Sequence, residues 1–94
     1  MPPEELVKGL TAGDAWDLDR ELAALGRAIR RLRHDRGLSM ASLASKAGVS
    51  ESTLSLIELG QGNPSFFGTL RALAEALDVT LTEIVLAAEN EAAR

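Results

Sequence analysis

Apolar side chains recur along this chain mainly at the spacing of an α-helix. One long stripe has steps of three and four residues and consists of Leu18, Leu22, Leu25, Ile29 and Leu32. This stripe predicts a helix whose start is marked by Asp14 and Asp17 and whose end is set by Gly37. No stretch alternates apolar and polar residues with the valine, isoleucine and aromatic enrichment of a strand. The sequence therefore predicts an all-α chain.

Three shorter helices are expected after the long one, each opened by a serine. Ser39 caps a helix over residues 40–47, and Ser50 caps a helix over residues 51–59. Ser65, which follows a proline, opens a third helix that runs to about residue 77.

Two more helical segments lie at the ends of the chain. Thr80 and Glu83 form a capping-box pattern that opens the last helix, with Leu81, Ile84, Val85 and Ala88 as its expected inward face. Near the N-terminus, residues 3–10 begin after a proline and contain Gly9 as a stop signal. This segment predicts a short extra helix.

The stretch from Met40 to Gly60 places small and apolar residues where two short helices would cross. Ala44 is small enough for a close crossing, Gly48 suits a left-handed turn, and Val49 fills the corner. The remaining residues of the expected buried side are Leu43, Ala47, Leu54 and Ile57. This spacing is that of a helix-turn-helix motif, and a plain corner of two helices without a ligand is the alternative.

Over residues 22–86 the chain resembles the phage-repressor and Cro type of helix-turn-helix family, also called XRE-like. The likeness is carried by LGRAIRRLRHDRGLSMASLASKAGVSESTLSLIELGQGNPS and by TLRALAEALDVTLTEIV. It implies a five-helix, lambda-repressor-like domain that binds DNA as a dimer, with the helix over residues 51–59 in the major groove. It also implies a structural salt bridge between Arg33 and Glu58. We expect an acidic N-terminal extension over residues 1–20, the DNA-binding domain over 21–88 and a C-terminal tail over 89–94.

Charge is distributed unevenly along the chain, whose net charge is −4. Residues 27–60 hold six basic residues and three acidic ones, whereas residues 1–26 and 61–94 are each net acidic. Nucleic acids favour basic surfaces, so only the middle of the chain suits such a partner. A run of arginines on a helix is also simply a solvated face.

The helix expected in the groove has an unusual outward face, because it contains neither lysine nor arginine. The residues expected to read bases are Ser50, Glu51, Ser52, Ser55 and Leu56. Glu51 either stabilises the helix dipole or accepts a hydrogen bond from the N4 amine of cytosine. Three alternatives are open for Leu56 and Leu59. They contact thymine methyl groups, they are covered by Phe66 or Phe67, or they belong to a protein interface.

Phosphate contacts must then come from outside this helix. Met40 stands where the family often has a glutamine that holds the phosphate backbone, and a thioether cannot donate that hydrogen bond. The expected contacts are Lys46, Gln61, Asn63, Arg27 and Arg31, with Arg30 and Arg36 as further arginines off the apolar stripe.

Enzymatic chemistry is poorly supported by the composition. The chain has no cysteine, which excludes disulfides and thiol nucleophiles, and His34 is its sole imidazole. We expect no catalytic activity, no metal and no cofactor. The N-terminus lacks a basic stretch before an apolar one, and the longest apolar run, residues 84–88, is far too short to span a membrane. A cytoplasmic protein is therefore expected.

Three functions remain open at this stage. The first is a dimeric regulator, most simply a repressor, that binds double-stranded operator DNA, with Trp16, Leu18 and the helix around residues 84–88 as dimer surface. The second is an antitoxin-like protein whose acidic N-terminal extension neutralises a protein partner. The third is a helix-turn-helix adaptor that binds only protein, which the absence of basic residues from 51–59 favours.

Overall fold

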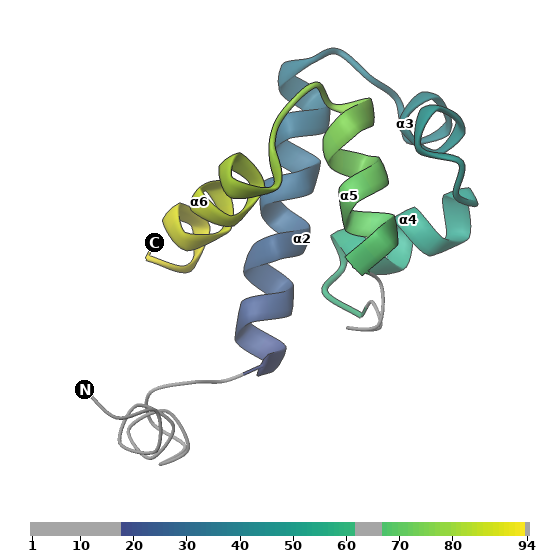
Figure 1. The fold of residues 1–94 in the computed structure, drawn as a ribbon. Coiled ribbons are helices and arrows are strands. Elements are labelled where there is room, and N and C mark those ends of the chain that lie inside the picture. Colours follow the sequence, from purple (N-terminus) through teal and green to yellow (C-terminus); the bar gives the residue numbers. More distant parts are fainter. Residues whose placement is uncertain (1–17, 62–66, 94) are drawn as a thin grey trace.

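The computed structural model describes residues 18–61 and 67–93. These residues form five helices and no strand: α2 Leu18–Asp35, α3 Met40–Ala47, α4 Glu51–Glu58, α5 Phe67–Ala76 and α6 Leu81–Ala92 (Figure 1). The predicted all-α, five-helix architecture is confirmed. The expected extra helix over residues 3–10, and the signals at Asp14, Trp16 and Asp17, lie outside the described residues. No helix in the described part of the chain is long and apolar enough to cross a membrane.

Helices α3, α4 and α6 begin where their polar caps predict. Ser65, the expected opening residue of α5, lies outside the described residues. The side chain of Ser39 accepts a hydrogen bond from the backbone N–H of Ser42 at 3.0 Å, which satisfies one of the free amides at the start of α3. At the start of α6, the backbone N–H of Glu83 donates to the Thr80 hydroxyl at 3.0 Å, and the Glu83 carboxylate accepts from the backbone N–H of Thr80 at 3.4 Å. The capping box at Thr80 is therefore present.

The turn between α3 and α4 depends on Gly48, whose φ of 71° lies in the left-handed region. A residue with a Cβ is strained in this conformation, whereas glycine adopts it freely. The backbone N–H of Val49 donates to the carbonyl of Ala44 at 3.0 Å and closes the end of α3. Val49 also packs against the hydrophobic core, as the sequence predicts.

The long helix α2 is buried on two sides. It passes between α6 on one side and the helices α3 to α5 on the other (Figure 1). Small residues make these approaches close: Ala24, Gly26 and Ala28 are all buried. The stripe of large apolar residues on α2 predicts only part of the buried surface of this helix. Its first residue, Leu18, is exposed.

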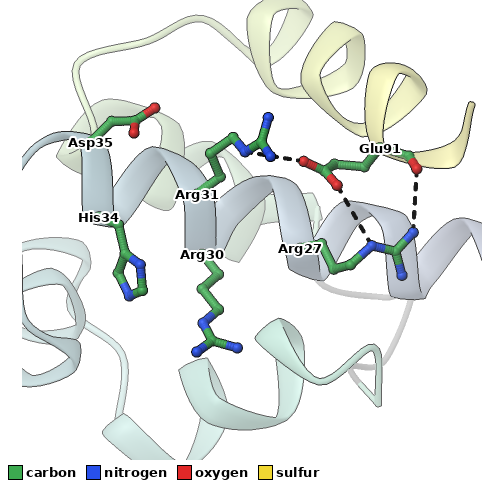
Figure 2. A pocket seen from close by; sticks show the side chains of 6 residues that line it. All are labelled: Arg27, Arg30, Arg31, His34, Asp35 and Glu91. Carbon is green, nitrogen blue, oxygen red and sulfur yellow. Dashed lines mark hydrogen bonds and ion pairs between the residues drawn. The ribbon is translucent and has the colours of Figure 1, made fainter. Parts of the chain in front are cut away.

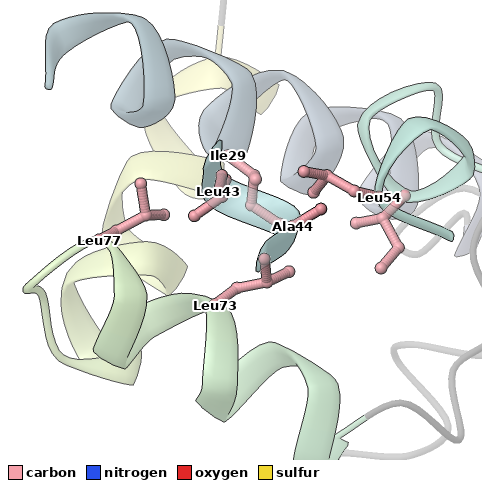
Figure 3. Close-up of a cluster of buried hydrophobic side chains, with 7 residues drawn as sticks. Ile29, Leu43, Ala44, Leu54, Leu73 and Leu77 are labelled. Atoms are coloured by element: carbon pink, nitrogen blue, oxygen red, sulfur yellow. The ribbon is translucent and has the colours of Figure 1, made fainter. Parts of the chain in front are cut away.

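The core lies where α2, α3, α4 and α5 meet, and Figure 3 shows its side chains converging. Its members are Ile29, Leu43, Ala44, Leu54, Ile57, Leu73 and Leu77. Each fully buried leucine or isoleucine contributes about 1.5–3 kcal/mol relative to an exposed one. The core thereby fixes α4 against the rest of the domain.

Three predicted boundaries and faces differ from the structure. The helix α4 ends at Glu58, and Leu59 is its cap. The helix α6 continues to Ala92, into the segment 89–94 expected as a tail, and its inward residues Ile84 and Ala88 are followed three positions further by the buried Glu91. Val85 lies about 100° around the helix from Ile84 and is exposed, so its expected place on the inward face is wrong.

Candidate nucleic-acid interface

Helix α4 presents a surface of short polar and apolar side chains. Leu54, Ile57 and Glu58 are buried toward the core. The outward positions follow from this spacing, and Glu51, Ser52, Ser55, Leu56 and Leu59 are exposed or half-buried there. The sequence therefore places the outward face of α4 as the structure does, although no basic residue lies on it.

The hydroxyl of Ser50 is used within α4 itself. Its oxygen accepts from the backbone N–H of Thr53 at 3.0 Å, and its hydroxyl donates to the Thr53 hydroxyl at 2.8 Å. Ser50 was expected to read bases, and in the structure its side chain caps the start of α4. Ser52, two positions further along, is exposed.

Two open recesses flank α4. One lies between the start of α3 and the outer face of α4, and is lined by Met40, Glu51, Ser52, Ser55 and Leu56. The other continues toward α2 and is lined by Arg30, Arg33, Met40, Ser55, Glu58 and Leu59. Met40 and Ser55 belong to both, so the two recesses form one surface that runs from α4 to Arg30.

An internal ion pair fixes the position of α4 against α2. The Nε of Arg33 donates to Oε2 of Glu58 at 2.8 Å, and its Nη2 donates to Oε1 at 3.0 Å. The remaining Nη1 donates to the carbonyl of Leu38 at 3.1 Å. Both side chains are buried, and the hydrogen bond to Glu58 raises the pKa of Arg33. This bidentate geometry holds α4 in one orientation, as the family resemblance implies.

Arg27, Arg30 and Arg31 of α2 extend to different sides of the helix (Figure 2). Arg27 and Arg31 extend toward α6, where their Nε atoms lie 3.7 Å and 3.2 Å from the carboxylate of Glu91. Arg30 and His34 extend from the other side of α2. The expectation that Arg27 and Arg31 contact phosphate required unpaired side chains, and the structure shows both of them paired.

Sequence reasoning missed Glu91, and it named Arg30 only as a further arginine off the apolar stripe. Glu91 is buried and is held by two arginines, although it falls in the segment expected to be a tail. A signal for it exists in the sequence, because Ile84, Ala88 and Glu91 continue one helical stripe. Arg30 is exposed, and it lines the recess beside Ser55 and Leu59 with no ion pair among the described residues.

The other expected phosphate contacts lie at the ends of helices. Lys46 is exposed in the last turn of α3 and has no ion pair within the described residues. Gln61 is exposed after α4, where its backbone N–H donates to the carbonyl of Leu56 at 2.8 Å. Asn63 lies outside the described residues. In the described part of the chain, no group of three or more histidine, aspartate or glutamate side chains is placed to hold a metal ion.

Proteins of related sequence contain a helix-turn-helix domain or are named as regulators. The family profile described as a helix-turn-helix domain matches residues 24–86. Over 61 residues the chain is 38% identical to the uncharacterized HTH-type transcriptional regulator y4dJ of Sinorhizobium fredii, and it covers 78% of that protein. Over 61 residues it is 41% identical to the immunity repressor protein of Bacillus phage phi105, of which it spans only 42%. Each match takes in 65% of this chain.

Solved structures share the fold. The restriction-modification controller protein C.AhdI from Aeromonas hydrophila superposes with a TM-score of 0.64 at 36% identity, over 67% of this chain and 94% of that one. The clp gene regulator ClgR from Corynebacterium glutamicum gives a TM-score of 0.73 at 30% identity, over 78% and 77% of the two chains. The fold and the surface of α4 define a helix-turn-helix domain. The chain belongs to the XRE-like helix-turn-helix family.

Proposed function

We propose that this chain is a sequence-specific regulator of transcription that binds operator DNA as a dimer, with α4 in the major groove. The observation that carries this proposal is the exposed face of α4, which the Arg33–Glu58 pair holds in place beside the cation Arg30, unpaired among the described residues. Membership of a family whose relatives are named as regulators and as a repressor supports the same function, and we propose repression on that likeness.

Selection of duplexes from a random pool by the full chain tests this function. A consensus with two related half-sites is expected, since a symmetric dimer reads the same sequence twice. If the selection enriches no particular sequence, the proposed sequence-specific binding is contradicted. Binding that does not change with salt would instead favour the protein-binding adaptor, because phosphate contacts always release counterions.

The outward residues of α4 suit base edges. Ser52 and Ser55 carry hydroxyl groups, which both donate and accept hydrogen bonds and therefore suit any base pair. Glu51 lies in the first turn, where its charge stabilises the helix N-terminus and its carboxylate suits the N4 amine of cytosine. In this proposal, Glu51 and Ser52 supply the polar part of sequence readout.

Arg30 is proposed as a phosphate contact in place of Arg27 and Arg31. It borders the surface of α4 through the recess that it shares with Ser55 and Leu59. Its guanidinium has no ion pair among the described residues, so no such pair must break before it binds an anion. Lys46, at the end of α3, is a second proposed contact of the same kind.

Replacing Arg30 by alanine is expected to weaken binding to all duplexes alike and to reduce the salt dependence. The slope of log affinity against log salt should fall by about 0.9 for each phosphate that the protein no longer neutralises, hence by nearly two for a dimer. The matched control is Arg31→Ala, which removes an arginine one position along α2 that is paired with Glu91. Equal changes in slope for the two variants would contradict the assignment of Arg30.

The dimer interface is proposed to include the outer face of α6. Val85 and Leu86 are adjacent, and they are 50% and 59% exposed. Two neighbouring exposed apolar side chains on one helix are a common feature of protein interfaces. Trp16, the other large apolar residue of the expected dimer surface, lies outside the described residues, and Leu18 is exposed at the start of α2.

Sedimentation is expected to show a dimer at micromolar concentration. Leu86→Glu should shift the protein toward monomer, because a charge would be buried at the interface. Leu59→Glu places the same charge at an exposed leucine at the end of α4 and should leave the dimer intact. A strictly monomeric wild-type protein, with and without operator, would remove this claim.

A further inference from the structure

The recess beside α4 is lined by apolar and by polar side chains. Met40, the first residue of α3, and Leu56, on the outer face of α4, both line it, and the hydroxyl-bearing residues Ser52 and Ser55 line it as well. Leu56 is 46% exposed, because it lies two positions along α4 from the buried Leu54 and therefore on nearly the opposite side of the helix. The exposed part of Leu56 is therefore available to a partner.

The charges around this recess indicate what kind of partner fits it. The carboxylate of Glu51 lines the recess itself. Arg30, which has no ion pair among the described residues, lines the adjoining recess, and Met40 and Ser55 are common to both recesses. A cation suits a phosphate, and a carboxylate suits an amine on a base edge, so this mixed surface fits a DNA duplex better than an apolar protein segment. In the major groove of DNA, the apolar group that a side chain meets is the 5-methyl group of thymine.

We propose that Met40 and Leu56 bind the 5-methyl group of a thymine, so that α4 selects a T·A pair at one position of each half-site. This inference rests on the proposed binding of duplex DNA. Neither side chain can form a strong hydrogen bond to a base edge, so their discrimination comes from burial of the methyl group. The contact supplies specificity to a helix that has no arginine for guanine.

Replacement of single thymines of the selected operator by deoxyuridine tests the proposal, because uracil differs from thymine only by the missing methyl group. The wild-type chain is expected to bind about fourfold more weakly at one position of each half-site, which corresponds to one methyl-sized group no longer buried. Deoxyuridine at the other positions should have a smaller effect.

Leu56→Ala should bring the affinities for the thymine and uracil duplexes closer together, because one of the two apolar side chains that bury the methyl group is gone, and the double variant with Met40→Ala should bind both duplexes equally. The control is Leu59→Ala, which removes an exposed leucine next to the same helix that does not line this recess, and it should keep the wild-type ratio. If the wild-type chain binds every deoxyuridine duplex as tightly as the thymine duplex, the methyl contact is refuted while DNA binding stands. If no duplex is selected at all, the proposed function falls and this inference falls with it.

Discussion

Replacing Gly26 by alanine is expected to lower the free energy of unfolding by about 2–3 kcal/mol, the upper part of the usual range for overpacking. A Cβ at this position would overlap the carbonyl oxygen of Ile57 and lie 2.6 Å from that of Glu58. These atoms belong to the backbone of α4, so the helix itself would have to move. The destabilisation is expected even though alanine favours a helix interior by about 1 kcal/mol over glycine.

Gly68→Ala is the matched control, because Gly68 also lies in a helix but a Cβ there would meet no atom of the described residues within 4 Å. This variant should gain up to about 1 kcal/mol in stability from helix propensity alone. Urea unfolding followed by circular dichroism measures both variants. Two variants that are equally stable, or a Gly26→Ala protein more stable than wild type, would show that α4 does not cross α2 as closely as described.

The second large effect is expected at the Arg33–Glu58 pair. Glu58→Ala should lower the free energy of unfolding by about 3–5 kcal/mol, because it leaves a buried guanidinium without its charge partner. Replacing both residues, as in Arg33→Met with Glu58→Leu, should recover much of this stability, since no buried charge is then left alone. The same unfolding experiments measure the effect.

A surface pair supplies the comparison. Arg71 and Glu75 are exposed and separated by 3.8 Å, so Glu75→Ala should change the free energy of unfolding by less than about 1 kcal/mol. Similar destabilisation by Glu58→Ala and Glu75→Ala would contradict the burial of the Arg33 pair. The raised pKa of Arg33 means that its contribution is complete at every pH below the ordinary arginine pKa, and would disappear only as the pH rises through the raised value.

The starts of α3, α4 and α6 and the turn between α3 and α4 were predictable from the sequence because their signals are local. A serine or threonine cap acts on an amide three residues away, and both Ser39 and Thr80 do so in the structure. Gly48 adopts the left-handed conformation within its own residue. Such features need no knowledge of the tertiary fold.

Burial by small residues was harder to foresee, because it depends on which helices cross. Ala24, Gly26 and Ala28 do not belong to the stripe of large apolar residues on α2, yet all three are buried. They become important only because α6 and α4 approach α2 from different sides. Helical periodicity detects one buried face and overlooks a second face made of small side chains.

In the candidate site too, features set by a single helix were predictable from the sequence, and features set by the packing of helices were not. The outward face of α4 was predictable, since the buried residues Leu54 and Ile57 determine which neighbours point away. The orientation of the arginines was not, because adjacent positions on a helix differ by about 100° and only the tertiary fold places Glu91 beside Arg31. The sequence left Arg27, Arg30, Arg31 and Arg36 as possible phosphate contacts, and the pairing of Arg27 and Arg31 with Glu91 is the ground on which we propose Arg30.

The central claim is that α4 reads the sequence of DNA, and binding to all single-base variants of the selected operator measures this most directly. Ser52→Ala and Glu51→Ala should each change the preferred base at one position of each half-site, by about 1–3 kcal/mol. Lys46→Ala is the control: it should weaken all variants alike, because a phosphate contact carries no sequence information. If the Ser52 and Glu51 variants keep the wild-type order of preference at every position, α4 does not read bases as proposed.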